Sequence, residues 1–118
     1  MSTMPDIQLT KDADALICVI YKEYLKKRES GIAKGEAKWF GGSDDLQKTF
    51  LPKWTPEDVD ETCLELQRAN LLACQCADNT VSECILSDSA IIYMERRFTN
   101  GLRGVLDYLK TIKSILLW

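Results

Sequence analysis

The chain has 118 residues, of which 46% are hydrophobic and 28% are charged, and its formal net charge is −3. This length is typical of one domain, and the hydrophobic fraction is sufficient for a buried core. No hydrophobic run reaches the roughly 20 residues that cross a bilayer, and the absence of histidine removes the commonest general base and metal ligand, so we expect no membrane span, no cofactor and no enzyme.

Residues 1–9 have no hydrophobic periodicity and are expected to form a flexible leader. Thr10 is expected to cap a long helix, because Asp12 and Asp14 follow it in the first turn, where the helix dipole favours acids. Gly31 is expected to end this helix. Apolar residues at helical spacing predict one buried face, which consists of Ala13, Leu16, Ile17, Ile20, Tyr21 and Tyr24.

The next segment predicts short elements. A strand contact is expected at Ile32, and residues 33–40 fit a second helix that ends at Gly41-Gly42. Ser43 is then expected to cap a further short helix. Trp54 is predicted to lie beneath the helix that follows it.

A third main helix is predicted from Thr55, with Pro56 at its first position and acids after it. Val59, Cys63 and Leu66 form its predicted buried face. Residues 55–95 carry nine acidic side chains and one basic side chain, which gives a local charge of 1 − 9 = −8. We therefore predict that the outward face of this helix binds a partner, through Asp58, Asp60, Glu61, Leu64, Glu65 and Arg68.

Residues 71–76 and 80–86 predict a β-hairpin across Asp78-Asn79, and its tip has no Lys or Arg. Strand alternation predicts that Cys74 and Cys76 point to the same face. Together with Cys63 and Cys84 they are the only zinc-like set, but the spacing does not fit a zinc knuckle. Small buried apolar side chains are the preferred interpretation, so no metal is expected. Five cysteines without a visible secretion signal favour a reducing cytoplasm.

Ser87 or Asp88 is expected to cap the next helix, and Asn100-Gly101 precedes the last one, residues 102–118. The last helix has a broad apolar stripe, which is expected to cover the core and also to build a homodimer. The predicted dimerisation residues are Leu102, Val105, Leu106, Leu109, Ile112 and Leu116.

Two stretches resemble winged-helix proteins at the end of the recognition helix and at the exit from the wing. The residues that carry the resemblance are Val59, Cys63 and Leu66 with Arg68-Ala69-Asn70-Leu71-Leu72 after them, and Ile85-Leu86-Ser87-Asp88 with Ile91 after it. Over residues 10 to about 115, the chain is similar to small YjcQ-like proteins of Gram-positive bacteria and their phages.

The resemblance implies a mainly helical α+β fold. It implies a winged helix-turn-helix with a two-stranded wing over residues 10–99 and a C-terminal helical extension over residues 100–118. Because the recognition helix is acidic, the expected function is non-enzymatic binding of a protein with a basic surface. A phage or prophage accessory protein, or an inhibitor that mimics the charge of DNA, would act in this way.

The alternative is a dimeric DNA-binding transcriptional regulator, since most winged helices bind DNA. Such a protein needs cations to neutralise phosphates. Because the third helix lacks them, the footprint would come from Lys26, Lys27, Arg28, Lys34, Lys38, Arg96, Arg97 and Arg103.

Overall fold

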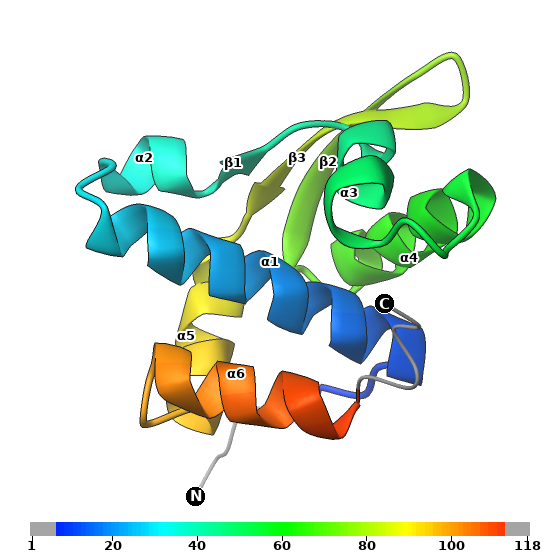
Figure 1. Ribbon diagram of the computed structural model, residues 1–118. Coiled ribbons are helices and arrows are strands. Elements are labelled where there is room, and N and C mark those ends of the chain that lie inside the picture. Colours follow the sequence, from blue (N-terminus) through cyan, green and yellow to red (C-terminus); the bar gives the residue numbers. More distant parts are fainter. Residues whose placement is uncertain (1–6, 113–118) are drawn as a thin grey trace, which may run out of the picture.

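The structure is a computed structural model that describes residues 7–112 (Figure 1). This part of the chain contains six helices and three strands. They are α1 (Lys11–Glu29), α2 (Lys34–Ala37), β1 (Trp39–Phe40), α3 (Ser43–Phe50), α4 (Pro56–Arg68), β2 (Leu72–Ala77), β3 (Thr80–Leu86), α5 (Asp88–Arg97) and α6 (Leu102–Thr111). The predicted mainly helical α+β class is confirmed, and the arrangement is compatible with a winged-helix-like mixed fold. None of the helices between residues 7 and 112 combines the length and hydropathy of a bilayer-spanning segment.

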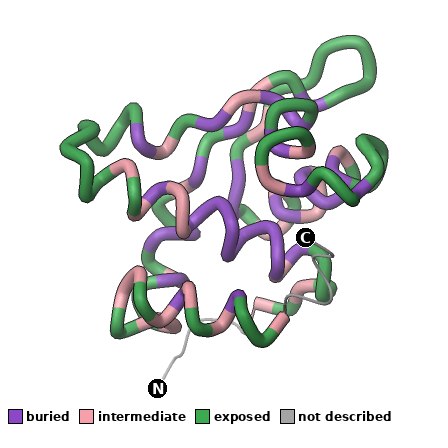
Figure 2. The backbone as a smooth tube through the Cα atoms, viewed as in Figure 1, coloured by how far each residue is buried: buried purple, intermediate pink, exposed green. Residues whose placement is uncertain are grey.

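Helix α1 forms the centre of the molecule. It lies between two groups of elements: the sheet, α3 and α4 are on one side of it, and α5 and α6 are on the other (Figure 1). Every residue from Ala15 to Tyr21 is buried, so the middle of this helix is enclosed on all sides (Figure 2). The prediction of a single buried face was therefore too narrow, because Cys18 and Val19 are also fully buried. Ile7 and Leu9, which fell within the predicted flexible leader, pack against the core.

The three strands form an antiparallel sheet in the order β1-β3-β2. Its inner face contributes Phe40, Cys84 and Leu86 to the core, while its outer face is exposed. A side chain of a neighbouring helix binds one backbone group at each edge of the sheet. Gln67 Oε1 of α4 accepts from the Cys74 N–H at 2.7 Å, and Lys27 Nζ of α1 donates to the Trp39 carbonyl at 2.8 Å. Occupied edge groups oppose pairing with a strand of another chain.

The segment between α1 and α3 differs from the prediction. The first strand is Trp39–Phe40 and not a contact at Ile32, because Trp39 and Phe40 pair with Ile85 and Cys84. The predicted helix over residues 33–40 is consequently limited to the four residues of α2. Gly42, not Ser43, is the N-cap of α3.

Gly42 allows α3 to begin directly against β3. A Cβ atom at this position would lie 2.7 Å from the Val81 carbonyl oxygen and 3.0 Å from that of Ser82. Both neighbours are backbone atoms and cannot rotate away. The close approach brings the Ser43 hydroxyl, whose residue is only 1% exposed, next to β3 and α4.

The hairpin follows the predicted turn. Asn70 ends the α4 region with φ 63°, and the two turn residues Asp78 and Asn79 have φ 53° and 65°. Such left-handed values are tolerated best by Gly, Asn and Asp. The pairing register shifts between Gln75 and Cys76. The extra residue of this bulge, Ser82, lies on β3, so β2 keeps its alternation: Cys74 pairs with Cys84 and Cys76 with Val81, both of which are buried. Cys74 and Cys76 therefore lie on the same face of the sheet, as predicted, although Cys76, near the hairpin tip, is exposed.

Helices α5 and α6 are joined to α1 by a polar cluster that the sequence did not suggest. Asp14 accepts from both terminal nitrogens of Arg97, one of them at 3.1 Å, and from the Tyr108 hydroxyl at 2.5 Å. The Arg97 guanidinium also lies 4.9 Å from the ring centroid of Phe98 and 4.6 Å from that of Tyr108. Asp14 was predicted to serve only the helix dipole, but it also fixes α5 and α6 against α1.

Candidate functional site

The N-terminal half of α4 presents the acids that the sequence singled out. Thr55 caps the helix by accepting from the Asp58 N–H at 3.1 Å, and Pro56 occupies the first helical position as predicted. Val59, Cys63 and Leu66 are fully buried, which confirms the predicted inner face. The acids of the first turns are therefore directed away from the core, where the positive end of the helix dipole also favours them.

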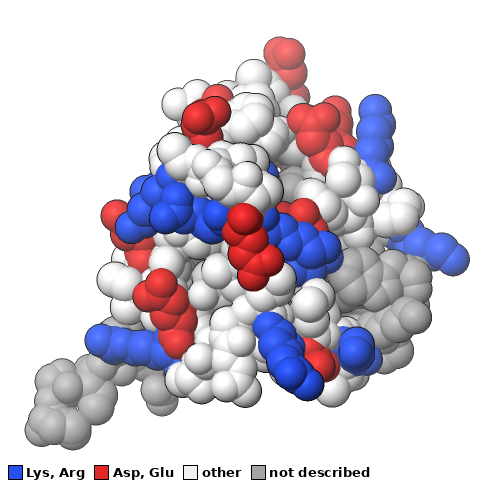
Figure 3. Space-filling model, turned by 60° about the vertical axis from the view of Figure 1, so that its left-hand side comes forward, with Lys and Arg blue, Asp and Glu red and all other residues white. Residues whose placement is uncertain are grey.

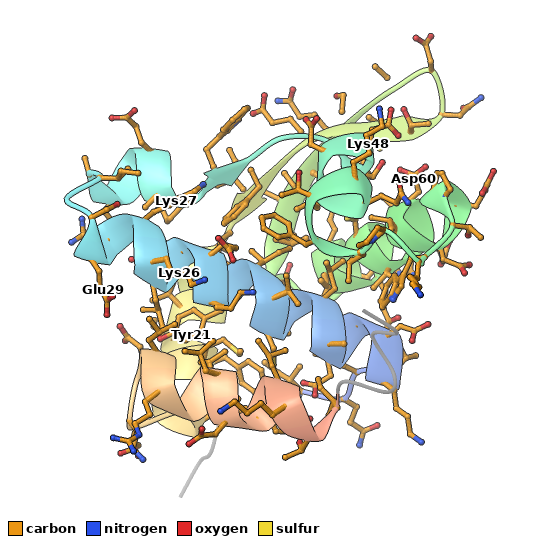
Figure 4. All side chains as sticks on the ribbon, viewed as in Figure 1. Tyr21, Lys26, Lys27, Glu29, Lys48 and Asp60 are labelled. Atoms are coloured by element: carbon orange, nitrogen blue, oxygen red, sulfur yellow. The ribbon has the colours of Figure 1, made fainter. Side chains whose placement is uncertain are left out.

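Asp60 is not part of this outward surface, contrary to the prediction. Its Oδ1 atom accepts from the Ser43 hydroxyl at 2.5 Å and from the Val81 N–H at 2.9 Å. Strand β1 pairs only with Cys84 and Ile85, so β3 has no neighbouring strand on that side at Val81. Asp60 replaces the missing strand partner and ties α4 to both α3 and β3 (Figure 4).

Glu65 is also used within the chain, although it was predicted to bind a partner. Its two oxygens accept from the backbone N–H of Thr10 at 3.0 Å and from the Thr10 hydroxyl at 2.8 Å. The same hydroxyl accepts from the Ala13 N–H at 3.1 Å and so caps α1. Glu65 therefore holds the start of α1 against the second half of α4.

The other predicted partner-binding residues have different surroundings. Leu64 is half-buried and packs against the core, so it offers little surface. Asp58 is exposed, as is Glu57 beside it. Glu61 and Arg68 are both exposed and form an ion pair at 3.2 Å. We define the α4 acidic surface as the exposed residues Glu57, Asp58 and Glu61.

The predicted dimerisation stripe faces the chain's own core. Val105 is fully buried and Leu109 is 3% exposed, because both pack within the single core that includes α1. Leu102, Leu106 and Ile112 are half-buried, and Leu116 lies outside the described residues. The strongest positions of the stripe are thus used inside one chain, and the homodimer remains a prediction.

Several cations of the proposed DNA footprint are also engaged. Arg97 belongs to the Asp14 cluster, and Lys38 Nζ lies 2.9 Å from Asp88 Oδ1. Lys27 donates to Trp39 and lies 3.9 Å from the Phe40 ring centroid. Desolvation lowers the pKa of Lys27, although the charge of Glu23 opposes the change.

Three of the five cysteines meet between α4 and the hairpin. Cys74 and Cys84 are directly paired across the strands, and the Cys74 thiol lies 3.7 Å from the Cys63 carbonyl oxygen. The hydrogen bond with Cys84, together with burial, strongly raises the pKa of Cys63, and burial raises the pKa of Cys74 to about 12. The Cys63 and Cys74 thiols are therefore protonated at neutral pH and poor nucleophiles. Within residues 7–112 no set of three or more potential ligands is arranged to hold a metal ion.

Comparisons of the chain with protein-family models, with curated proteins and with solved structures gave no match. The functional argument therefore depends on the chemistry of the surfaces described above.

Proposed function

We propose that the protein is a non-enzymatic winged-helix interaction protein that binds the basic surface of another protein through the α4 acidic surface. The element order α1, β1, α3, α4, β2 and β3, with the strand order β1-β3-β2, supports a winged helix-turn-helix. In that arrangement α4 holds the position of the recognition helix and the β2–β3 hairpin that of the wing.

The observation that carries the proposal is the charge of α4 and the hairpin. Arg68 is the only basic residue between positions 55 and 95, and it is paired with Glu61. A helix that enters a DNA groove needs cations to replace counterions at the phosphates. The exposed carboxylates of Glu57 and Asp58 would instead repel the phosphates, whereas they would attract a basic protein surface.

The setting is proposed from the resemblance to YjcQ-like proteins of bacteria and phages. An acidic recognition helix on a fold that commonly docks on DNA can occupy the DNA-binding surface of another protein. We therefore propose a phage or prophage accessory protein or inhibitor. Its acids would steer association and add modestly to affinity, because exposed ion pairs contribute only about 0.2–1 kcal/mol each.

The experiment compares two variants with the same loss of charge. In the first, Glu57→Gln, Asp58→Asn and Glu61→Gln remove the α4 acidic surface. In the control, Glu29→Gln, Glu36→Gln and Glu95→Gln remove three exposed acids from other helices. An arginine-rich peptide serves as a defined basic probe, and backbone amide chemical shifts report where it binds.

We expect the peptide to shift α4 amides most, and the α4 variant to bind about five- to thirty-fold more weakly, which corresponds to about 1–2 kcal/mol from three exposed charges. The control variant should bind like the unmodified protein. Equal losses in both variants would contradict the proposal. A gel shift with duplex DNA at low salt and micromolar protein would favour the DNA-binding regulator instead, since phosphate contacts strengthen as salt falls.

A further inference from the structure

The charges on the face shown in Figure 3 do not single out a partner, because basic and acidic side chains are interspersed there. The thiols beside α4 have no part in the proposed function. Cys84 of β3 has a thiol on each of two sides, since Cys63 hydrogen-bonds with it and Cys74 is paired with it across the strands. Thiols that lie this close together permit disulfide chemistry.

The backbone geometry at Cys74 and Cys84 suits a disulfide. Residues directly opposite in an antiparallel pair exchange either two hydrogen bonds or none. The Cys74 N–H points away from β3, because it donates to Gln67 Oε1 of α4 at 2.7 Å. Cys74 and Cys84 are therefore a non-hydrogen-bonded pair, in which the Cα atoms lie about 4.5 Å apart and the side chains are closest. This separation falls within the roughly 4.4–6.8 Å that disulfides span.

The two thiols are directed at different acceptors in the reduced protein. Cys74 Sγ lies 3.7 Å from the Cys63 carbonyl oxygen, and Cys84 Sγ lies 3.3 Å from the Gly41 carbonyl oxygen. Both cysteine side chains are on the inner face of the sheet. Rotation about the Cα–Cβ bond of each residue would replace two weak S–H···O contacts by one S–S bond.

Cys76 connects this pair to solvent. Cys84 is fully buried and Cys74 is partly buried, whereas Cys76 is exposed. Cys76 lies two residues beyond Cys74 on the same face of β2, so their Cα atoms are about 6.4–6.8 Å apart. That distance is at the upper limit for a disulfide, so a bond between Cys74 and Cys76 is strained and easily exchanged. An oxidant that reaches Cys76 can therefore act on the inner pair.

We propose that Cys74 and Cys84 form a disulfide that locks β2 to β3 when the protein meets a low-molecular-weight disulfide, RSSR, such as oxidised glutathione. The Cys76 thiolate attacks RSSR, forms a mixed disulfide and releases one RS⁻. Cys74 then attacks the Cys76 sulfur and releases the second RS⁻, and Cys84 attacks Cys74 and frees Cys76. Each attacking thiol gives up a proton, which the released thiolate takes up. The net reaction oxidises Cys74 and Cys84 by two electrons and reduces RSSR to two RSH.

The product changes the hairpin and its contact with α4. The disulfide joins residues that are 84 − 74 = 10 positions apart, and it stabilises the hairpin mainly by restricting the unfolded chain. It also withdraws the Cys74 thiol from the Cys63 carbonyl of α4. The lock is open where thiols are kept reduced and closes under oxidation. It uses no residue of the α4 acidic surface and does not depend on the proposed function.

The test incubates the reduced full chain with excess oxidised glutathione and then alkylates the remaining thiols under denaturing conditions. A protease that cleaves after glutamate places Cys63, Cys84 and the two cysteines of β2 on three peptides, which are residues 62–65, 84–95 and 66–83. We expect mass spectrometry to find 66–83 linked to 84–95 through Cys74, with Cys63 and Cys76 alkylated. The thermal midpoint should rise by about 5–10 °C and return to its original value after reduction with dithiothreitol.

Matched variants assign the roles of the thiols, and circular dichroism checks that each variant folds. Cys84→Ser should abolish both the linked peptides and the rise in thermal midpoint. Cys76→Ser should slow formation of the linked peptides about tenfold or more, because the exposed thiol is lost. Cys63→Ala should form the disulfide as the unmodified protein does. Because burial raises the pKa of Cys74 to about 12, the reaction should accelerate about tenfold per pH unit above neutrality.

Four outcomes would overturn the inference. They are a glutathione adduct that stays on Cys76 without loss of a second thiol, a link between peptides 62–65 and 84–95, a disulfide-linked dimer on a non-reducing gel, or an unchanged rate in Cys76→Ser. The variant that lacks the α4 acidic surface should form the same disulfide. Failure of the α4 proposal therefore leaves this test intact, and the reverse also holds.

Discussion

Replacement of Asp60 by alanine is expected to destabilise the fold far more than any other neutralisation on α4. The substitution removes the acceptor of two donors, the Ser43 hydroxyl and the Val81 N–H. Ser43 is 1% exposed and Val81 is 3% exposed, so water reaches neither donor easily. A buried donor left without a partner costs about 1–3 kcal/mol. This cost applies in full to the Val81 N–H, whereas the Ser43 hydroxyl can still donate to the Val81 carbonyl oxygen at 3.3 Å. We therefore expect Asp60→Ala to lower the free energy of unfolding by about 2 kcal/mol, a substantial part of the 5–15 kcal/mol typical of a domain.

Urea unfolding followed by circular dichroism measures this loss, and two variants calibrate it. Asp60→Asn keeps an oxygen at Oδ1 and should cost about 1 kcal/mol, the difference between a charged and a neutral acceptor. Glu61→Ala removes an exposed ion pair with Arg68 and should cost less than about 1 kcal/mol. If Asp60→Ala and Glu61→Ala destabilise the protein equally, Asp60 does not hold α3 and β3 as the contacts indicate.

Three further predictions follow from the same geometry. Gly42→Ala should lower the thermal midpoint by several degrees, because its Cβ would meet the backbone of β3, whereas Gly35→Ala meets nothing within 4 Å and should leave the midpoint unchanged or raise it. Asp14→Asn should cost about 2 kcal/mol at neutral pH. Burial raises the pKa of Asp14, but the hydrogen bonds from Arg97 and Tyr108 and the charge of Arg97 together lower it by more. The pKa of Asp14 in the folded protein therefore lies below its ordinary value of 3.8. The stability difference from the unmodified protein, measured by urea unfolding, should thus be complete above that value and vanish as the pH falls through the lower folded pKa. An aromatic disulfide reagent should modify one thiol rapidly at neutral pH, and Cys76→Ser should abolish this rapid reaction, since Cys76 is the exposed cysteine among the five. Rapid modification of a second thiol would contradict the described packing.

Local signals in the sequence were sufficient for the parts of the fold that depend on neighbouring residues. Thr10 and Thr55 cap their helices as predicted, because a cap needs only a hydroxyl and the amide three positions later. Asn70 and Asp78-Asn79 adopt the left-handed backbone that their short polar side chains permit. Strand β1 escaped prediction because two residues carry too little periodicity, and its existence depends on pairing with β3, far along the chain.

The roles of the charged side chains depended on distant partners and could not be predicted from spacing. Asp14 and Arg97 are 83 positions apart in the sequence, and Thr10 and Glu65 are 55 apart. Helical periodicity correctly placed Glu65 on the outward face of α4. It could not show that α1 begins on that side, where Thr10 donates to the Glu65 carboxylate. By contrast, the apolar stripe of α6 was predicted correctly to cover the core, since Val105 and Leu109 are buried in the cluster that includes α1, while the second subunit remains a prediction.

The acids of α4 have different structural roles, and this changes how the charge of the helix should be interpreted. Glu57 and Asp58 serve both the helix dipole and the exposed surface, whereas Asp60 and Glu65 make tertiary contacts. Asp60 and Glu65 are held by donors from α3, β3 and the start of α1, so their removal would reduce stability and binding together. Charge reversal at Asp60 could therefore abolish binding merely by loosening α3. Only Glu57, Asp58 and Glu61 separate the two effects, because their side chains are exposed and fix no other element of the described fold. A loss of binding in that variant, at unchanged stability, would identify a surface and not a structural support.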